Sequence, residues 1–203
     1  MTVEYNELQL DALRELSNMG VGTAATALSQ MLGQDVGLSV PRALALPLAD
    51  AVDAAGAPEQ VVTGIVIPIV GDLQALILLL IPAQDAETLC GLLGIQADSE
   101  DGRSALSEIG NILGASYMHA LAAATALELD LAPPQVGTDL LASIVSAVLV
   151  AGAGAGETDT ALVLDTALDL ADHPCSVSML LVPIGNSIAR LLAPLGLAEG
   201  EPD

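Results

Sequence analysis

Two copies of one spaced pattern place a carboxylate and a carboxamide on the same face of a helix. Each copy has Glu at its second position, Asn three residues later, and Pro after 22 further residues. The first copy is Asp11, Glu15, Asn18 and Pro41, and the second, 93 residues later, is Ser104, Glu108, Asn111 and Pro134. At about 100° per residue, the first three members of each copy lie within roughly 60° of one another on a helix. Four matched positions at one offset indicate two related sites.

Small residues continue both polar stripes by one more turn. Gly22 follows the first Asn by four positions, and Ala115 follows the second by four. Their short side chains would let a partner surface come close to the helix. Glycines also occur at Gly20, Gly110 and Gly114, and because no strand precedes them we interpret them as helix-packing residues and not as phosphate loops.

The alternative reading of these residues is a solvated helix face. Glu and Asn on an exposed helix usually serve only solubility, and either copy alone would carry little weight. Asn inside a helix is mildly unfavourable, because its side chain competes for backbone hydrogen bonds. Two such residues at the same register therefore need a reason, and function supplies one.

The charge of the chain excludes several classes of partner. The formal net charge is −22, with four arginines, no lysine and neither Phe nor Trp. Such a surface repels nucleic acid and anionic lipid. The composition is typical of proteins from extreme halophiles, so a haloarchaeal source is expected. The core must be aliphatic, and Met19 and Met31 are assigned to it.

The sequence indicates a cytoplasmic protein with no metal of its own. No basic, hydrophobic leader is recognisable at the N-terminus. Cys90 and Cys175 are too few for a disulfide framework, and with the two histidines they lack zinc-ligand spacing. The apolar run Leu140 to Gly156 falls short of a membrane span, and a buried strand pair with a glycine-rich turn is preferred.

The elements that must carry the two stripes also repeat. Helices are predicted from Asn6, as N-cap, to Leu32 and from Asp101 or Ser104 to about Leu127. Short extended stretches follow, ending near the motif prolines, and then strand pairs and short helices. The strands are predicted over Val36–Val40, Val61–Val70, Gln74–Ile81, Leu127–Ala132, Ala161–Leu170 and Ser176–Val182, with strand-like Ala43–Val52 and Leu141–Val150, and the short helices over Ala83–Leu93 and Ile184–Leu195.

The predicted fold class is α+β with a pseudo-two-fold repeat. Two long motif helices would pack on a shared, mainly antiparallel sheet of about six strands. We expect one domain over residues 1–203, with halves of about 1–97 and 98–203.

The residues resemble those of a known family. The pattern Asp/Ser-x3-Glu-x2-Asn-x22-Pro is the signature of the CheC, CheX and FliY group of chemotaxis phosphatases. The stretches ELSNMGVGTAATALSQML and SEIGNILGASYMHALA look like its two motif helices. Two intact motifs favour a CheC-type member, because CheX-like proteins carry one.

The resemblance implies hydrolysis of the phosphoaspartate of a CheY-like response regulator. Asn18 and Asn111 would position the attacking water, and Glu15 and Glu108 would pair with the receiver lysine. Asp11 and Ser104 would border the docking surface, joined by Gly22 and Ala115, while Pro41 and Pro134 would shape a loop against the motif helix. No cofactor is implied, since the divalent metal belongs to the receiver substrate.

Two alternatives remain open at this point. A non-catalytic adaptor could bind phosphorylated CheY, a CheD-type deamidase, or both, and the resemblance implies CheD as a partner. The pair of Glu and Asn favours catalysis, because an adaptor could lose Asn and still bind. Membrane insertion through Leu140 to Gly156 is the third reading and is not favoured.

Overall fold

The computed structural model describes residues 7–153, 160–170 and 175–184. Its helices are α1 (Glu7–Leu32), α2 (Leu48–Ala55), α3 (Ala83–Leu92), α4 (Glu100–Thr125) and α5 (Leu141–Ala153). Its strands are β1 (Val36–Pro47), β2 (Val61–Gly71), β3 (Ala75–Pro82), β4 (Leu129–Leu131), β5 (Gln135–Leu140), β6 (Thr160–Leu170) and β7 (Cys175–Pro183).

The strands form one sheet that both halves of the chain build. Its order is β1-β6-β7-β3-β2-β4, with β5 also paired to β2, and each described pairing is antiparallel. The predicted α+β fold with a mainly antiparallel sheet is confirmed, and the described residues form seven strands where about six were expected.

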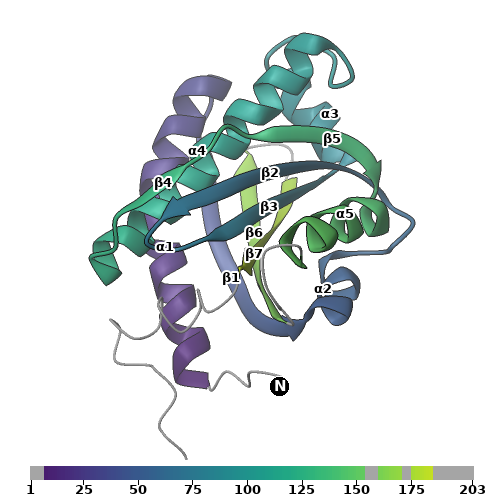
Figure 1. Cartoon of the computed structure of the whole chain (residues 1–203). Coiled ribbons are helices and arrows are strands. Elements are labelled where there is room, and N and C mark those ends of the chain that lie inside the picture. The colour runs from purple at the N-terminus through teal and green to yellow at the C-terminus, as the bar shows by residue number, and fades with distance from the viewer. Residues whose placement is uncertain (1–6, 154–159, 171–174, 185–203) are drawn as a thin grey trace, which may run out of the picture.

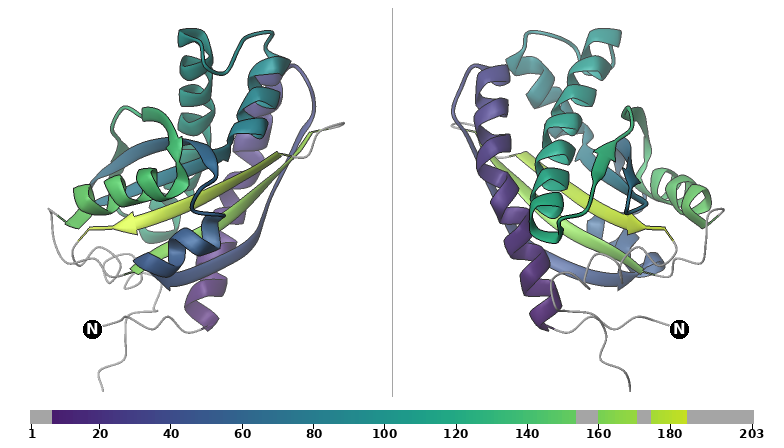
Figure 2. Two further views of the ribbon diagram at one scale, coloured as in Figure 1. Left: turned by 90° about the vertical axis from the view of Figure 1, so that its right-hand side faces the viewer. Right: turned by 60° about the vertical axis from the view of Figure 1, so that its left-hand side comes forward.

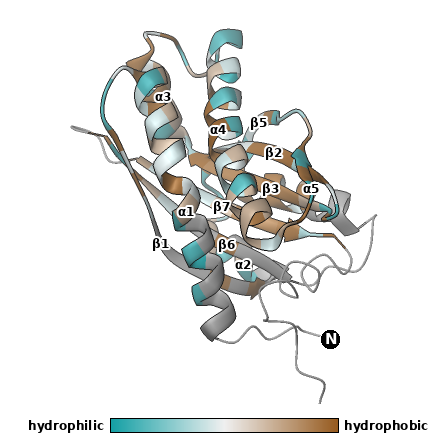
Figure 3. Cartoon of the chain, turned by 90° about the vertical axis from the view of Figure 1, so that its left-hand side faces the viewer, coloured by the Kyte–Doolittle hydropathy of each residue, from teal (hydrophilic) through white to brown (hydrophobic). Residues whose placement is uncertain are grey.

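Helices cover both faces of the sheet (Figures 1 and 2). On one face α1, α3 and α4 bury side chains against Ile65, Ile67 and Ile77. On the other face α2 and α5 bury side chains against Leu78 and Leu80. Successive residues of a strand point to opposite faces of the sheet. Strands that are apolar at successive positions therefore supply side chains to the hydrophobic cores on both faces. Figure 3 shows the face with α1 and α4, where brown strands lie behind the two helices.

The motif helices and the strands that follow them in the chain repeat at the same 93-residue offset as the motif. Both ends of α1 recur 93 residues later as the ends of α4, and the span of β1 recurs as the span from the start of β4 to the end of β5. The outer strand of each half pairs with the hairpin of the other half, β1 with β6 and β5 with β2. The halves are therefore interleaved in one sheet.

Local signals explain where the motif helices begin and end. Gly33 follows the last residue of α1 and has a φ of +69°. This left-handed conformation ends a helix, and glycine adopts it with the least strain. Ser99 caps α4, and its Oγ accepts a hydrogen bond from the Gly102 amide at 2.9 Å. The helix begins at Glu100, one residue before Asp101 and four before Ser104, the two predicted starts, and it ends at Thr125, two residues before the predicted Leu127.

The stretch Leu141 to Val150 is a helix, and the strand expected there is wrong. Leu141, Val145 and Val148 are buried while Ser143 and Ser146 are exposed, which is the spacing of a helix with one buried face. The expected strand over Ala43 to Val52 is wrong in its second part for the same reason, because α2 begins at Leu48. Within the described residues, no helix is long and apolar enough to cross a membrane.

Two further strand predictions need correction. β1 runs on through Pro41 to Pro47 and does not stop near the proline, and β5, which was not predicted, is a largely exposed edge strand of mixed polarity. The strands β2, β3, β6 and β7, the turn at Gly71 and Asp72, and the helix α3 are confirmed. The predicted cap at Asn6 and the predicted helix beyond Ile184 lie outside the described residues.

Candidate functional site

The first polar stripe lies on the solvent side of α1. Asp11, Glu15, Asn18 and Gly22 are all exposed, as the helical spacing predicts. An Asp11 carboxylate oxygen lies 3.2 Å from the Arg14 guanidinium, and both side chains are largely exposed. Such a pair contributes at most about 1 kcal/mol, but it partly neutralises the negative charge next to Glu15. A Cβ placed on Gly22 would have no heavy atom within 4 Å, so this turn of the helix is open to a partner.

The second stripe, on α4, is less open. Ser104 and Glu108 are exposed, whereas Asn111 and Ala115 are half-buried. The cause is the position of the helix, because α4 contacts α1 along one side and β4 and β5 along the other. Gly110, next to Asn111, also brings α4 close to the sheet, since a Cβ there would lie 2.8 Å from the Ile65 side chain.

The two helices cross close to both asparagines. A Cβ on Gly20 would lie 2.6 Å from the carbonyl oxygen of Ser116, so the two backbones touch at this point. Gly20 follows Asn18 by two residues, and Ser116 follows Asn111 by five. The helices run in roughly opposite directions on the same face of the sheet (Figure 2). At about 100° per residue, Asn18 lies about 160° around α1 from Gly20 and Asn111 about 140° around α4 from Ser116, so both asparagines point away from the crossing.

The motif prolines lie where the outer strands are interrupted. The register of β1 against β6 shifts between Ser39 and Arg42, the segment that contains Pro41. Half-buried Pro134 lies in the break between β4 and β5. Proline has no amide hydrogen to donate, so it suits these irregular positions. Pro41 lies within a strand, and the loop predicted there is wrong.

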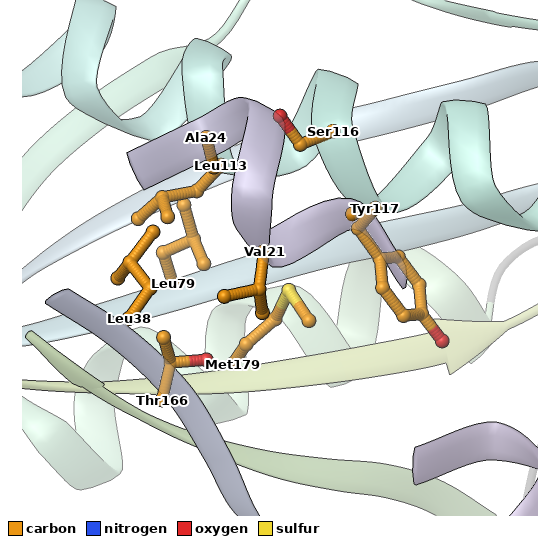
Figure 4. A pocket seen from close by; sticks show the side chains of 10 residues that line it. Val21, Ala24, Leu38, Leu79, Leu113, Ser116, Tyr117, Thr166 and Met179 are labelled. Atoms are coloured by element: carbon orange, nitrogen blue, oxygen red, sulfur yellow. The ribbon is translucent and has the colours of Figure 1, made fainter. Parts of the chain in front are cut away.

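The described residues leave a small cavity between the two motif helices and the sheet. The small cavity under the helix crossing has a volume of about 30 Å³ and a largely apolar lining from α1, α4 and the sheet, with Val21, Leu113 and Met179 pointing into it (Figure 4). It could hold about one water molecule and no substrate. The larger open groove of about 710 Å³, lined in part by Glu87, Gln96 and Arg103, lies at the start of α4, beside the second stripe.

The described residues offer no thiol nucleophile. Burial raises the pKa of Cys90, and burial together with nearby Asp85 raises the pKa of Cys175 to about 11. Both thiols are therefore protonated and unreactive at neutral pH. Within the described part of the chain, no three His, Cys, Asp or Glu side chains gather in a way that could hold a metal ion.

Met19 was assigned to the core from the sequence, and this is wrong. Its side chain is 61% exposed, beside Asn18 and one turn from Glu15. On a helical wheel, Met19 lies only about 40° from Glu15, which is the signal that could have placed it on the surface. The equivalent residue on α4, Ile112, is half-buried against the core. The first stripe therefore has an exposed apolar neighbour that the second lacks.

Together, the two helix faces present paired carboxylates and carboxamides, with Glu15, Asn18 and Glu108 exposed and Asn111 half-buried. A carboxamide can hold a water, and a carboxylate can bind a cation. The two faces are therefore suited to completing a reaction centre supplied by another macromolecule.

Comparison with known proteins gives consistent matches. Residues 8–44 and 102–137 match the model of the CheC-like family, and each stretch holds one complete motif. CheY-P phosphatase CheC of Bacillus subtilis (strain 168) is 34% identical over 200 residues, covering 94% of this chain and 95% of that protein. The CheC1 protein of Halobacterium salinarum is 25% identical over 174 residues, covering 81% of this chain and 84% of that one.

Among solved structures, Thermotoga maritima FliY superposes with a TM-score of 0.74. The alignment covers 97% of this chain and 100% of that chain at 15% identity. At this identity the likeness concerns the fold alone.

Proposed function

The chain belongs to the CheC-like family, and on that premise we propose that it hydrolyses the phosphoaspartate of a CheY-like response regulator in chemotaxis. The Bacillus relative, which is named for this activity, aligns with nearly the whole of both chains. The single observation that carries the proposal is the pair of Glu and Asn stripes on neighbouring helices, one within each matched stretch, with both Glu side chains and Asn18 exposed and Asn111 half-buried.

The mechanism rests on what the receiver lacks. An aspartyl phosphate is labile, and the receiver supplies a divalent metal and a lysine that neutralise the phosphoryl oxygens. Hydrolysis still needs a water held in line with the bond that breaks. Asn18 or Asn111 accepts from and donates to that water without changing its own protonation state. In the reaction the water oxygen bonds to phosphorus, the bond to the aspartate oxygen breaks, and inorganic phosphate leaves.

Glu15 and Glu108 act as the anchors. Each lies one helical turn before its Asn, so a salt bridge to the receiver lysine sets the distance from the amide to phosphorus. A helix on the surface of the protein suits this task because the phosphoryl group lies in the receiver, and the helix must reach toward it. The protein needs no cofactor of its own in this scheme.

The test is the double variant Asn18→Ala with Asn111→Ala. Loss of both water-positioning groups raises the barrier by about 2–4 kcal/mol, which lowers the rate of accelerated dephosphorylation by roughly 30- to 1,000-fold. Receiver binding stays largely intact, because the contact surface remains. The matched control is Gln30→Ala, which removes an exposed carboxamide from α1 outside the stripe. A double variant that hydrolyses at the wild-type rate would refute the mechanism.

The same variant separates the enzyme from an adaptor. A non-catalytic adaptor for phosphorylated CheY would bind the receiver and leave its dephosphorylation rate unchanged, in wild type and variant alike. We also propose a CheD-type deamidase as a second partner, as the family resemblance implies, which a pull-down with purified CheD would test. The acidic, lysine-free composition supports a working environment in a cytoplasm of high salt.

A further inference from the structure

On α1, the side chain of Asn18 lies between a carboxylate and a guanidinium. At about 100° per residue, Glu15 lies about 60° to one side of Asn18 around the helix, and Arg14 lies about 40° to the other side. Helical side chains lean toward the N-terminus of their helix, so the Asn18 carboxamide extends over the turn that carries both residues. Residues three and four apart have Cβ atoms about 5–6 Å apart, which makes Arg14 as close a neighbour of Asn18 as Glu15 is.

The Arg14 guanidinium is paired with Asp11 at the surface of the helix. Arg14 Nη2 lies 3.2 Å from an Asp11 carboxylate oxygen, and the two side chains are 47% and 67% exposed, respectively. Water and salt weaken an exposed pair of this kind. The guanidinium can therefore exchange the Asp11 carboxylate for a more highly charged anion at little cost.

A cation at this position is unusual for this chain. The sequence has 26 acidic residues against four arginines and no lysine, so a generally basic surface does not account for Arg14. Without it, the first stripe would present the carboxylates of Asp11 and Glu15 to a phosphoryl group that is itself negative. Arg14 therefore supplies positive charge where the proposed reaction needs it.

The second stripe lacks this cation. The residue 93 positions after Arg14 is Ser107, which is half-buried on α4. Asn111 consequently lies between the Glu108 carboxylate and a hydroxyl group. The two stripes share their carboxylate and carboxamide but differ in the charge beside the carboxamide.

We propose that Arg14 is a further catalytic residue of the first site, where its guanidinium donates hydrogen bonds to the phosphoryl oxygens of the receiver. This inference rests on the proposed function and concerns the chemistry at one of its two sites. A planar guanidinium suits this contact, because two of its N–H groups can bind two phosphoryl oxygens at once. Docking removes the contact from water and so limits its screening by salt. Arg14 stays protonated throughout, so no proton moves to or from it while the water attacks phosphorus.

The contact should be measurable as a loss of activity at the first site. In an Asn111→Ala background, where the first site carries out the hydrolysis, Arg14→Gln should lower kcat/KM by roughly tenfold. This is the low end for hydrogen bonds to charged groups, since the receiver's metal and lysine already share the phosphoryl charge. Arg14→Lys should give an intermediate rate, because it keeps the charge and loses the planar fork. The matched control is Arg103→Gln, which removes an exposed guanidinium at the start of α4 and should leave the rate of the first site unchanged.

Binding separates contact with the phosphoryl group from docking in general. In a Glu108→Ala background in molar KCl, calorimetry compares the receiver with and without beryllofluoride and Mg²⁺, which mimic the phosphoryl group. Arg14→Gln should lower the preference for the beryllofluoride-bearing receiver by a factor similar to its loss in kcat/KM. Glu15→Ala should instead weaken binding of both forms, because the receiver lysine is present in both.

Three results would contradict the inference. If Arg14→Gln keeps both the rate and the binding preference of its parent, the assignment of Arg14 is overturned while the phosphatase function stands. A loss of equal size in an Asn18→Ala background, in which the second site carries out the hydrolysis, would reveal a general effect of charge and would also overturn it. If the wild-type protein does not speed dephosphorylation at all, the proposed function itself fails, and the inference fails with it.

Discussion

Two glycines on one helix should respond to alanine in opposite ways. Gly20 and Gly22 are both inside α1, so Gly→Ala gains about 1 kcal/mol of helix propensity at either position. At Gly22 the new methyl group meets open space, and the variant should be about 1 kcal/mol more stable than wild type. At Gly20 the methyl group would meet the Ser116 oxygen at 2.6 Å, closer than real Cβ atoms approach such a neighbour.

The difference between the two variants isolates the helix crossing. The gain in helix propensity is common to both variants, so it cancels when their free energies of unfolding are subtracted. The remaining difference is the cost of forcing α1 away from α4. Overpacking of this kind costs about 1–3 kcal/mol, and the backbone contact puts Gly20→Ala at the upper end of that range. Separation of the helices would also enlarge the cavity of about 30 Å³ that Gly20 and Ser116 line.

Equilibrium unfolding by guanidinium chloride measures this difference directly. The midpoint should rise for Gly22→Ala and fall for Gly20→Ala, with equal slopes. Equal free energies of unfolding for the two variants would refute the reasoning about the crossing. Gly22→Ala should raise stability but lower receiver binding. In a Glu108→Ala background, the added methyl group should weaken receiver docking at the first site even though the fold is more stable.

Other expectations can be checked in the same assays. Asn18→Ala should lower activity more than Asn111→Ala at limiting receiver, because Asn18 is exposed and Asn111 is half-buried; equal losses would remove this argument but leave both sites. Met19→Gln should weaken receiver binding at the first site without lowering the free energy of unfolding, because its side chain is 61% exposed and contributes apolar contact only in a complex. Cys90 and Cys175 should resist thiol reagents at pH 8 in the folded protein and react on unfolding, and a native thiol that labels rapidly would contradict their burial. The raised pKa of Cys175, about 11 against 9.0, contributes stability below pH 9 that is lost as pH rises from about 9 to about 11; the unfolding midpoint followed over that range in wild type and Cys175→Ala measures it. Finally, the midpoint of thermal unfolding should rise with KCl concentration, because salt screens repulsion within a chain of net charge −22.

Much of the architecture could be read from local patterns. The long apolar strands of β2, β3, β6 and β7 and the turn at Gly71 were predicted within a few residues, because these features depend on neighbouring residues. The failures share a cause. Leu141 to Val150 is rich in β-branched residues yet folds as a helix, because its buried face is needed to cover the sheet. β5 is an exposed edge strand that forms only because β2 offers it a partner.

The sequence by itself determined which side chains share a helical face. The turn per residue is a local property of the backbone, so Glu15 and Asn18 on one helix, and Glu108 and Asn111 on the other, were placed together before any tertiary contact was known. It could not determine how exposed each stripe is. Asn18 is open and Asn111 is half-buried because α1 and α4 have different neighbours, which lie far away in the chain.

The tertiary structure alone decided the distance between the two stripes. That distance depends on the contact between Gly20 and the Ser116 backbone, which are nearly a hundred residues apart. No periodicity in either helix encodes it, because it arises when both helices bury their apolar faces on one sheet. The same packing left Met19 on the surface next to Asn18, although its apolar side chain had suggested the core.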